Sequence, residues 1–166
     1  CKEQKAIRRM LKASGLTPEQ RLTKLTDFKP SAMTMQMYRQ AERYLSEFPV
    51  IFKSDADSKG MAMTGTVGIG KTMLATIIAN ELLNRTIPTV FIVAPDLIAE
   101  LRAAQFSEEK EALEQKIQKL STVQACIFDD IAKEKPSEWV QTQYFRIIDA
   151  RCREKLPTIF TSNYTF

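Results

Sequence analysis

The segment from residue 65 to residue 72 has the residue types needed to hold a polyphosphate. It reads Gly-Thr-Val-Gly-Ile-Gly-Lys-Thr and matches the pattern G-x-x-x-x-G-K-[ST]. Glycine allows tight backbone turns that point N–H groups inward, and these groups can surround phosphate oxygens. Lys71 can reach the β- and γ-phosphates, and the Thr72 hydroxyl can bind Mg²⁺. The predicted phosphate-binding residues are Gly65, Thr66, Val67, Gly68, Ile69, Gly70, Lys71 and Thr72.

Two carboxylates and an amide follow two of the apolar runs of the chain. Asp129 and Asp130 directly follow one run, and Asn163 closes another. Side chains at the carboxyl ends of parallel strands face the ligand crevice of an α/β sheet. Beside a phosphate-binding loop, we expect Asp129 to join Thr72 in holding Mg²⁺ and Asp130 to orient an attacking water. Asn163 is expected to sense the γ-phosphate or that water, so the predicted catalytic set is Lys71, Asp130 and Asn163.

Each of these features also has a plainer interpretation. Two adjacent acids can cap a strand and begin a turn, and an asparagine after a strand is more often a turn residue than a ligand. A glycine-rich loop with a lysine can be a simple turn. The position of the loop between a predicted strand and a predicted helix favours the phosphate site, and that site in turn favours functional roles for the acids and the amide.

Hydrophobic periodicity predicts alternating strands and helices after residue 60. The predicted strands are 61–64, 89–93, 124–128 and 158–161. The predicted helices between them are 95–105, 108–120, one around 73–82 and one around 140–148. Earlier in the chain we predict helices over 3–13 and 34–48, the second closed by Pro49, and a helix start at Thr17. Strands joined by helical crossovers predict an α/β fold, a P-loop NTPase core whose parallel sheet has helices on both faces.

Composition excludes several classes of protein and of site. A chain of 166 residues with 44% hydrophobic residues fits an ordinary globular domain rather than a disordered one. The absence of histidine excludes histidine triads, histidine metal ligands and histidine general bases. Three cysteines are too few for a disulfide scaffold, and no apolar run is long enough to span a membrane, so we expect a cytoplasmic protein. Residues 1–60 carry 12 basic against 7 acidic side chains, so the basic excess lies at the front.

Several stretches together give the chain a family resemblance. They are Ile127–Ile131, Glu134–Val140, Ile148–Arg151 and Leu156–Tyr164. With the phosphate loop, these stretches resemble the AAA+ ATPases, and among them the bacterial helicase loaders of the DnaI/DnaC type, which are primosome components. The resemblance assigns residues 65–72 to Walker A, Asp129 and Asp130 to Walker B, and Asn163 to sensor 1. Most AAA+ proteins have glutamate where Asp130 stands, and this shorter side chain predicts slow hydrolysis.

The resemblance implies partners and a domain organisation. It implies an ATPase that binds ATP or ADP with Mg²⁺. Such a protein binds the replicative hexameric helicase and assists its loading onto single-stranded DNA. The resemblance also implies homo-oligomers that form through the AAA+ domain, and no membrane contact. Residues 1–33 are expected to form a basic helical linker after a partner-binding domain, and residues 34–166 an ATP-binding domain that ends after the sensor 1 strand. Because the arginine finger follows sensor 1 in the family, this fragment is expected to hydrolyse ATP weakly.

Other functions compete with the loader. An IstB-like transposition helper ATPase shares the same core, a small-molecule P-loop kinase would share the loop, and a nucleotide-dependent binding module needs no turnover. Lys2, Lys5, Arg8, Arg9 and Lys12 of the first helix either contact DNA or a protein partner or form a solvated face. Cys126 and Cys152 are predicted to be buried. Arg146, Arg151 and Arg153 are predicted to be solvated or ion-paired. Phe28, Tyr38 and Tyr44 are predicted to be core residues rather than an adenine clasp.

Overall fold

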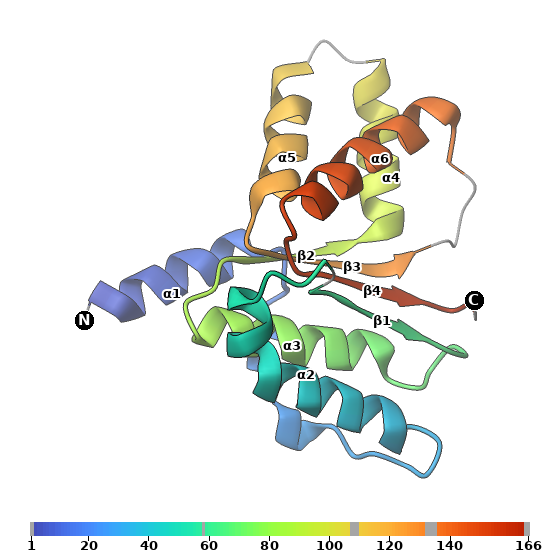
Figure 1. The fold of residues 1–166 in the computed structure, drawn as a ribbon. Helices are drawn as coiled ribbons and strands as arrows, with labels where there is room; N and C mark the ends of the chain where they lie inside the picture. The colour runs from blue at the N-terminus through green and yellow to red at the C-terminus, as the bar shows by residue number, and fades with distance from the viewer. Residues whose placement is uncertain (1, 58, 107–109, 132–135, 165–166) are drawn as a thin grey trace.

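The sheet at the centre of the fold has four parallel strands. The computed structural model describes residues 2–57, 59–106, 110–131 and 136–164. The strands are β1 (Met61–Thr64), β2 (Thr89–Val93), β3 (Ala125–Ile131) and β4 (Thr158–Ser162), in the order β1-β4-β3-β2. Because every neighbouring pair is parallel, the four carboxyl ends lie at the same edge of the sheet (Figure 1). The predicted α/β fold is confirmed.

Helices cover both faces of this sheet (Figure 1). α2 (Met35–Lys53) and α3 (Lys71–Asn84) lie on one face, and α4 (Ala94–Gln105), α5 (Lys110–Thr122) and α6 (Glu138–Arg153) lie on the other. α1 (Lys2–Ala13) contacts α3 and projects from the side of the molecule. Two 3-10 turns, η1 (Gln20–Leu22) and η2 (Leu25–Asp27), lead from α1 to α2. Within the described ranges, no helix combines the length and the apolar character that a bilayer crossing requires.

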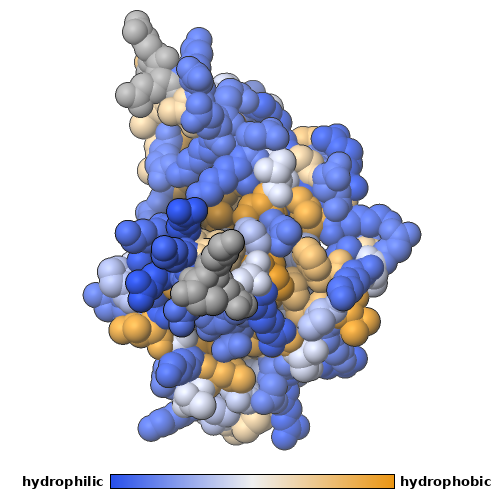
Figure 2. Space-filling model, turned by 90° about the vertical axis from the view of Figure 1, so that its left-hand side faces the viewer, coloured by the Kyte–Doolittle hydropathy of each residue, from blue (hydrophilic) through white to orange (hydrophobic). Residues whose placement is uncertain are grey.

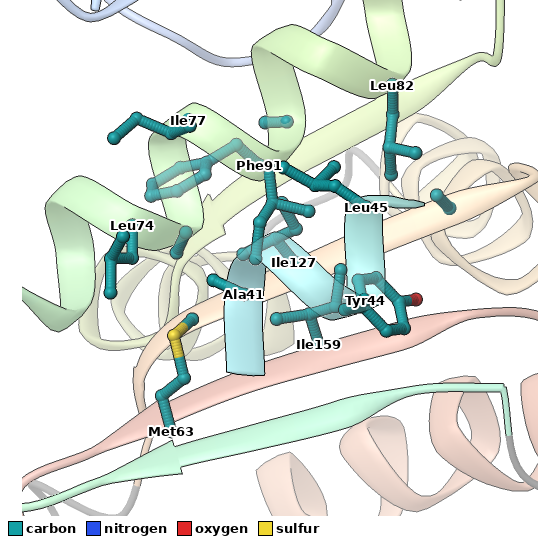
Figure 3. Packing of buried hydrophobic residues seen from close by; sticks show 14 of the residues in the cluster. Ala41, Tyr44, Leu45, Met63, Leu74, Ile77, Leu82, Phe91, Ile127 and Ile159 are labelled. Carbon is teal, nitrogen blue, oxygen red and sulfur yellow. The ribbon is translucent and has the colours of Figure 1, made fainter. Parts of the chain in front are cut away.

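An apolar cluster packs α3 against the sheet and so positions the two elements, β1 and α3, that flank the phosphate-binding loop. α3 is buried along most of its length, because apolar residues occur on nearly all sides of it. Each fully buried leucine or isoleucine stabilises the fold by about 1.5–3 kcal/mol. Figure 3 shows the packing of Met63, Ile127 and Ile159 of the sheet against Leu74, Ile77 and Leu82 of α3 and Ala41, Tyr44 and Leu45 of α2.

The prediction that Pro49 ends the second helix is wrong. α2 continues through Pro49 to Lys53. A proline inside a helix has no N–H for the carbonyl four residues earlier, which here belongs to Leu45. The Arg85 guanidinium donates a hydrogen bond to the Leu45 carbonyl at 2.6 Å. A contact from another element therefore replaces the missing helical hydrogen bond, and no pattern within the helix itself could have revealed it.

The predicted helix start at Thr17 forms its cap but almost no helix. The Thr17 N–H donates to Gln20 Oε1 at 2.9 Å, and the Gln20 N–H donates to Thr17 Oγ1 at 3.2 Å. These reciprocal bonds are those of a capping box. Only the short turn η1 follows, and it ends at Leu22. The segment then passes across α3 to Phe28, which is buried.

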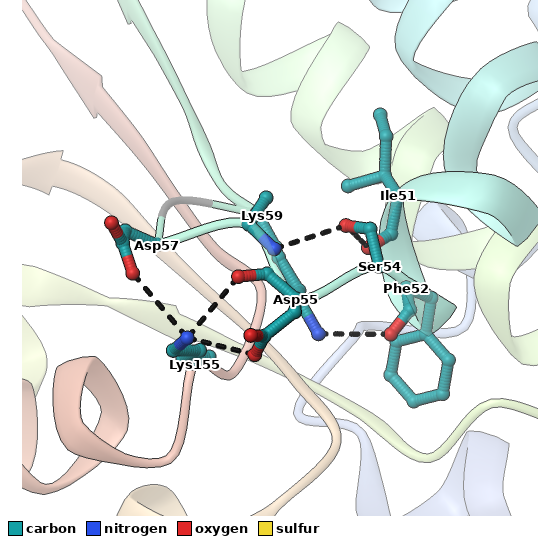
Figure 4. A network of polar contacts seen from close by, with 8 residues as sticks. Ile51, Phe52, Ser54, Asp55, Asp57, Lys59 and Lys155 are labelled. Carbon is teal, nitrogen blue, oxygen red and sulfur yellow. Dashed lines mark hydrogen bonds and ion pairs between the residues drawn. The ribbon is translucent and has the colours of Figure 1, made fainter.

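Ion pairs hold the loop before β1 against the end of α6 (Figure 4). Lys155 Nζ donates to Asp55 Oδ1 at 2.8 Å and lies 3.3 Å from Asp57 Oδ1. Hydrogen bonding to Asp55 raises the pKa of Lys155 and holds the pKa of the Asp55 carboxyl below its ordinary value. Lys59 Nζ donates to the Phe52 carbonyl at 3.0 Å. Exposed pairs of this kind contribute little stability each, and here they mainly fix the path of the loop.

The two described cysteines differ in exposure, so the prediction that both are buried is half wrong. Cys126 lies in β3 with no exposed surface, and burial raises the pKa of its thiol to about 12. Cys152 is exposed on α6. That helix packs on the sheet through Val140 and Ile147, and Cys152 does not lie on the same face.

In a Cys1→Ser background at pH 8, we expect iodoacetamide to label Cys152 and to spare Cys126. The thiolate is the reacting species, and at this pH the buried thiol of Cys126 is almost entirely protonated. Peptide mass spectrometry gives the labelling of each cysteine, and the urea-unfolded chain is the control in which both react. Equal labelling in native buffer would contradict the burial of β3 between two helical layers.

Candidate functional site

Gly70 joins the phosphate-binding loop to the first turn of α3. It directly precedes the helix and has a φ of +90°. A Cβ at this position would lie 2.5 Å from Cε2 of Phe28, which is closer than any real contact. The position therefore requires glycine both for its left-handed backbone and for the approach of the Phe28 ring. Phe28 and Tyr44 are core residues, as predicted, and Phe28 also supports the loop.

We expect Gly70→Ala to destabilise the protein more than Gly68→Ala. Both positions have left-handed backbone, which costs an L-residue about 1–2 kcal/mol. A Cβ at Gly68 meets no atom within 4 Å, whereas one at Gly70 meets Phe28 and adds roughly 1–3 kcal/mol of overpacking. Urea unfolding measures both losses, and Phe28→Leu should restore part of the Gly70→Ala loss. Equal losses for the two alanine variants would contradict the contact.

Lys71 is held over the loop by backbone carbonyl groups. Its Nζ donates to Gly65 O at 2.8 Å and to Thr66 O at 2.7 Å, and the residue is only 6% exposed. Desolvation by burial lowers the pKa of Lys71, and the charges of Asp130 and Asp129 oppose that shift. The ammonium group therefore lies within the field of both carboxylates, at the position from which it can meet phosphate oxygens.

Asp129 is the centre of a hydrogen-bonded group that joins three elements. Thr72 Oγ1, in the first turn of α3, donates to the carboxylate and lies 3.0 Å from each oxygen. Thr161 Oγ1, on β4, donates to Asp129 Oδ1 at 2.6 Å. Asp129 is 4% exposed, and burial raises the pKa of its carboxyl while the hydrogen bonds from Thr161 and Thr72 lower it. The hydroxyl and the carboxylate predicted to share Mg²⁺ are thus in contact.

A bulge in β3 turns Asp130 toward Asn163. The strand continues to Ile131, three residues beyond its predicted end, and its register with β4 shifts between Phe128 and Ile131. Asp130 has a φ of +60°, a strained conformation for a residue other than glycine. Its N–H donates to Thr161 Oγ1 at 2.8 Å, and its Oδ1 accepts from Asn163 Nδ2 at 2.7 Å. The predicted pair of Asp130 and Asn163 is therefore in direct contact.

A pocket of about 600 Å³ contains most of these groups. Four of the predicted site residues lie outside its lining. The carbonyls of Gly65 and Thr66 hold Lys71, the Ile69 side chain lies close to Gly65, and Asp129 lies behind Thr72 and Thr161. The residues that line the pocket are Gln20, Thr23, Val67, Gly68, Gly70, Lys71, Thr72, Met73, Thr76, Asp130, Thr161 and Asn163.

Sequence reasoning missed two parts of this pocket. Thr161 was not among the predicted site residues, yet it bridges Asp129 and the backbone of Asp130. Its place at the end of the predicted strand, two residues before Asn163, was the available signal. Gln20 and Thr23 line the pocket from a turn about fifty residues before the loop. Nothing in the local pattern of that turn indicates a ligand.

The donor chemistry of the site fits a magnesium–nucleotide complex. Thr72 and Asp129 offer hydroxyl and carboxylate oxygens, the ligand type that Mg²⁺ prefers, and Mg²⁺ is commonly held by one or two carboxylates together with phosphates. In the described part of the chain, no group of three or more histidine, cysteine, aspartate or glutamate side chains could hold a metal ion by itself. A magnesium ion held by Thr72 and Asp129 would complete its coordination with phosphate and water oxygens.

The chain has relatives among helicase loaders and insertion-sequence proteins. The replicative helicase loader DnaI of Bacillus subtilis is 27% identical over 124 residues, which make up 74% of this chain and 39% of that protein. The ATP-binding protein of insertion sequence IS5376 from Geobacillus stearothermophilus is 36% identical over 102 residues, or 61% of this chain and 39% of that protein. The chain therefore spans about two fifths of the length of each.

A solved structure and a family comparison complete the assignment. The crystal structure of DnaI superposes with a TM-score of 0.72 and 29% identity, covering 92% of this chain and 78% of that one. These matches confirm the resemblance to loaders of the DnaI/DnaC type and the AAA+ fold. The match to the family described as IstB-like ATP binding protein runs over residues 1–166. The chain therefore belongs to the IstB-like ATP-binding proteins.

Proposed function

We propose that this protein is an ATP-switched helicase loader, which binds the replicative hexameric helicase and assists its placement on single-stranded DNA. The observation that carries the ATP-dependent part is the continuous contact from Thr72 through Asp129 and Thr161 to Asp130 and Asn163. This contact joins the phosphate loop to both acids and to the sensor position. The loader part is supported by the likeness to the replicative helicase loader DnaI.

The side chains of the site divide the chemistry among them. Lys71 and the loop amides bind the phosphates, and Thr72 and Asp129 hold Mg²⁺, which when bound neutralises charge on the phosphate oxygens. Asp130 accepts a hydrogen bond from Asn163 through one oxygen, and its carboxylate orients a water near the pocket. The strained backbone of Asp130, with its φ of +60°, sets the direction of this short side chain. Because aspartate reaches less far than the glutamate of most AAA+ proteins, we propose that hydrolysis is slow.

A nucleotide-dependent pull-down tests the loader role. Immobilised replicative hexameric helicase is incubated with the full-length protein and ATP, ADP or no nucleotide, and the retained protein is quantified. We expect retention that depends on the nucleotide and falls in Lys71→Met. Retention by a transposase with none by the helicase would contradict the loader role.

The likeness to an insertion-sequence protein favours a second candidate, a transposition helper ATPase. That relative has a higher identity than the loader, 36% against 27%, although over a shorter stretch. Both functions need the same nucleotide site, so mutations there do not separate them. The same pull-down with the transposase from the same replicon decides between them, because each function predicts retention by one partner and not by the other.

The exposed face of α1 is our proposed contact for the DNA backbone. Lys5, Arg8, Arg9 and Lys12 are exposed on this helix, and hydrophilic surface covers much of the side of the molecule from which α1 projects (Figure 2). Cations arranged in this way bind phosphates with a strong dependence on salt. Replacing all four with glutamine should weaken single-stranded DNA binding in a fluorescence anisotropy titration and flatten its salt dependence. An unchanged salt slope would remove α1 from the DNA contact.

A further inference from the structure

The turn that contains Gln20 and Thr23 forms the part of the pocket that the phosphates leave open. The proposed function assigns the phosphate end of the pocket to Lys71 and Thr72 and the hydrolytic side to Asp130 and Asn163, all of which line it. The base and the ribose must therefore lie against the remaining lining. When the loop glycines and Val67 are counted with the phosphate end and Thr161 with the hydrolytic side, that lining consists of Gln20, Thr23, Met73 and Thr76. Half of this wall thus belongs to a segment far from the loop in sequence.

One side chain, Asn80 of α3, connects this turn to the rest of the fold by hydrogen bonds. Its Nδ2 donates to the carbonyl of Gln20 at 2.7 Å and to the carbonyl of Thr23 at 2.9 Å. An asparagine amide nitrogen has two N–H groups, so both are used and the orientation of the amide is determined. Asn80 is 5% exposed and lies one helical turn after Thr76, on the same side of α3. The contact thus joins both ends of the turn to the helix that begins at the phosphate loop.

The other hydrogen bonds of the turn are local. Apart from the two bonds from Asn80, each hydrogen bond of residues 17–24 within the described part of the chain has both partners within residues 17–27. Leu22 is 75% exposed and adds little packing. Asparagine is also a weak helix former, and here it interrupts a buried apolar stretch of α3. Its presence is accounted for by the two carbonyls that it holds.

We propose that Asn80 is a positioning residue that sets the base side of the nucleotide pocket, by holding the turn that carries Gln20 and Thr23. The inference rests on the proposed nucleotide-binding function. It adds an explanation of how the pocket discriminates between nucleotides and other polyphosphates. Losing Asn80 frees the turn, so a ligand loses its contacts on the base side and keeps its contacts on the phosphate side. Asn80 therefore acts on affinity for the nucleoside part alone.

The test compares ATP with inorganic tripolyphosphate, which carries the phosphates and no nucleoside. Each displaces a fluorescent ATP analogue from the wild type and from Asn80→Asp, a variant of nearly equal size that places a carboxylate against the two carbonyls. We expect ATP affinity to fall about tenfold or more while tripolyphosphate affinity stays within about twofold. Discrimination between ATP and GTP should fall in the same variant. Equal losses for ATP and tripolyphosphate, or no loss for either, would overturn the proposal.

Two further variants keep the result interpretable. Asn84→Ala changes an exposed asparagine one turn later on the same helix, and it should leave both affinities unchanged. Thr23→Trp fills the base side from a partly exposed position without touching the core, so it should block ATP and spare tripolyphosphate even where the Asn80 variant fails to fold. A Thr23→Trp protein that binds ATP normally would overturn the base-side assignment. A wild type that binds neither ligand would instead overturn the nucleotide-binding function itself.

Discussion

Lys71→Met should lose most of its affinity for ATP and keep its fold. In the proposed site the ammonium group is the cation that contacts the phosphates. Hydrogen bonds to charged groups contribute about 1.5–3 kcal/mol, which corresponds to roughly 10- to 100-fold in affinity. In the free protein this group is 6% exposed and its pKa is lowered by desolvation, so its charge adds little to stability. Titration with a fluorescent ATP analogue and thermal unfolding measure the two effects separately.

Two controls separate the loss of charge from a change of shape. Lys71→Arg keeps the charge but cannot place one nitrogen between the carbonyls of Gly65 and Thr66, so it should retain only part of the affinity. Lys59→Met removes a lysine that contacts the Phe52 carbonyl away from the pocket, and it should bind ATP normally. If Lys71→Met bound ATP as tightly as the wild type, the loop would not be a phosphate site.

We expect Arg151→Met to destabilise the protein strongly. The sequence predicted a solvated or ion-paired arginine, and this is wrong, because Arg151 is 1% exposed and, among the described residues, donates to no carboxylate. Its guanidinium donates to the carbonyls of Leu120, Val123 and Pro157 and to Thr158 Oγ1, at 2.7–2.9 Å. These groups lie where α5 and α6 lead into β3 and β4. Burial lowers the pKa of the guanidinium, and these four acceptors compensate its desolvation.

Removing the guanidinium leaves buried carbonyls without donors, at about 1–3 kcal/mol each. The total expected loss is roughly 3 kcal/mol or more, which lowers the Tm by about 6–12 °C for a chain of this length. Arg153→Met is the matched control, because Arg153 is two residues away, its side chain is 69% exposed, and it forms an ion pair with Asp149. It should change stability by less than about 1 kcal/mol. Similar losses of stability in the two variants would show that the buried hydrogen bonds of Arg151 contribute no more to stability than the exposed ion pair of Arg153.

Local patterns were sufficient to predict most of the fold. The strands β1 and β2 have their predicted bounds, because short apolar runs beside turn residues leave little freedom. Two errors in the bounds of elements occur where a distant group intervenes. Arg85 allows α2 to pass through Pro49, and the bulge at Asp130 extends β3 beyond its apolar run. Each of these two features depends on a contact between residues more than thirty positions apart. The hydrophobic periodicity of one element carries no information about such a contact.

For the candidate site, the sequence by itself determined which chemical groups are present and the order in which they occur. The phosphate loop, the two acids and Asn163 were all found from residue types and spacing, since a parallel sheet brings the carboxyl ends of its strands to one edge. Their roles stay predictions that the variants above can test.

Only the tertiary structure decided how these groups meet. The register shift between β3 and β4 turns Asp130 onto Asn163 and places Thr161 between the two acids. Packing of the turn before α2 on α3 adds Gln20 and Thr23 to the pocket, and Asn80 donates hydrogen bonds to both of their carbonyls. The physical reason is that hydrogen bonds between elements depend on the register and packing of the whole sheet, whereas the residue types that make a loop or a strand are fixed locally.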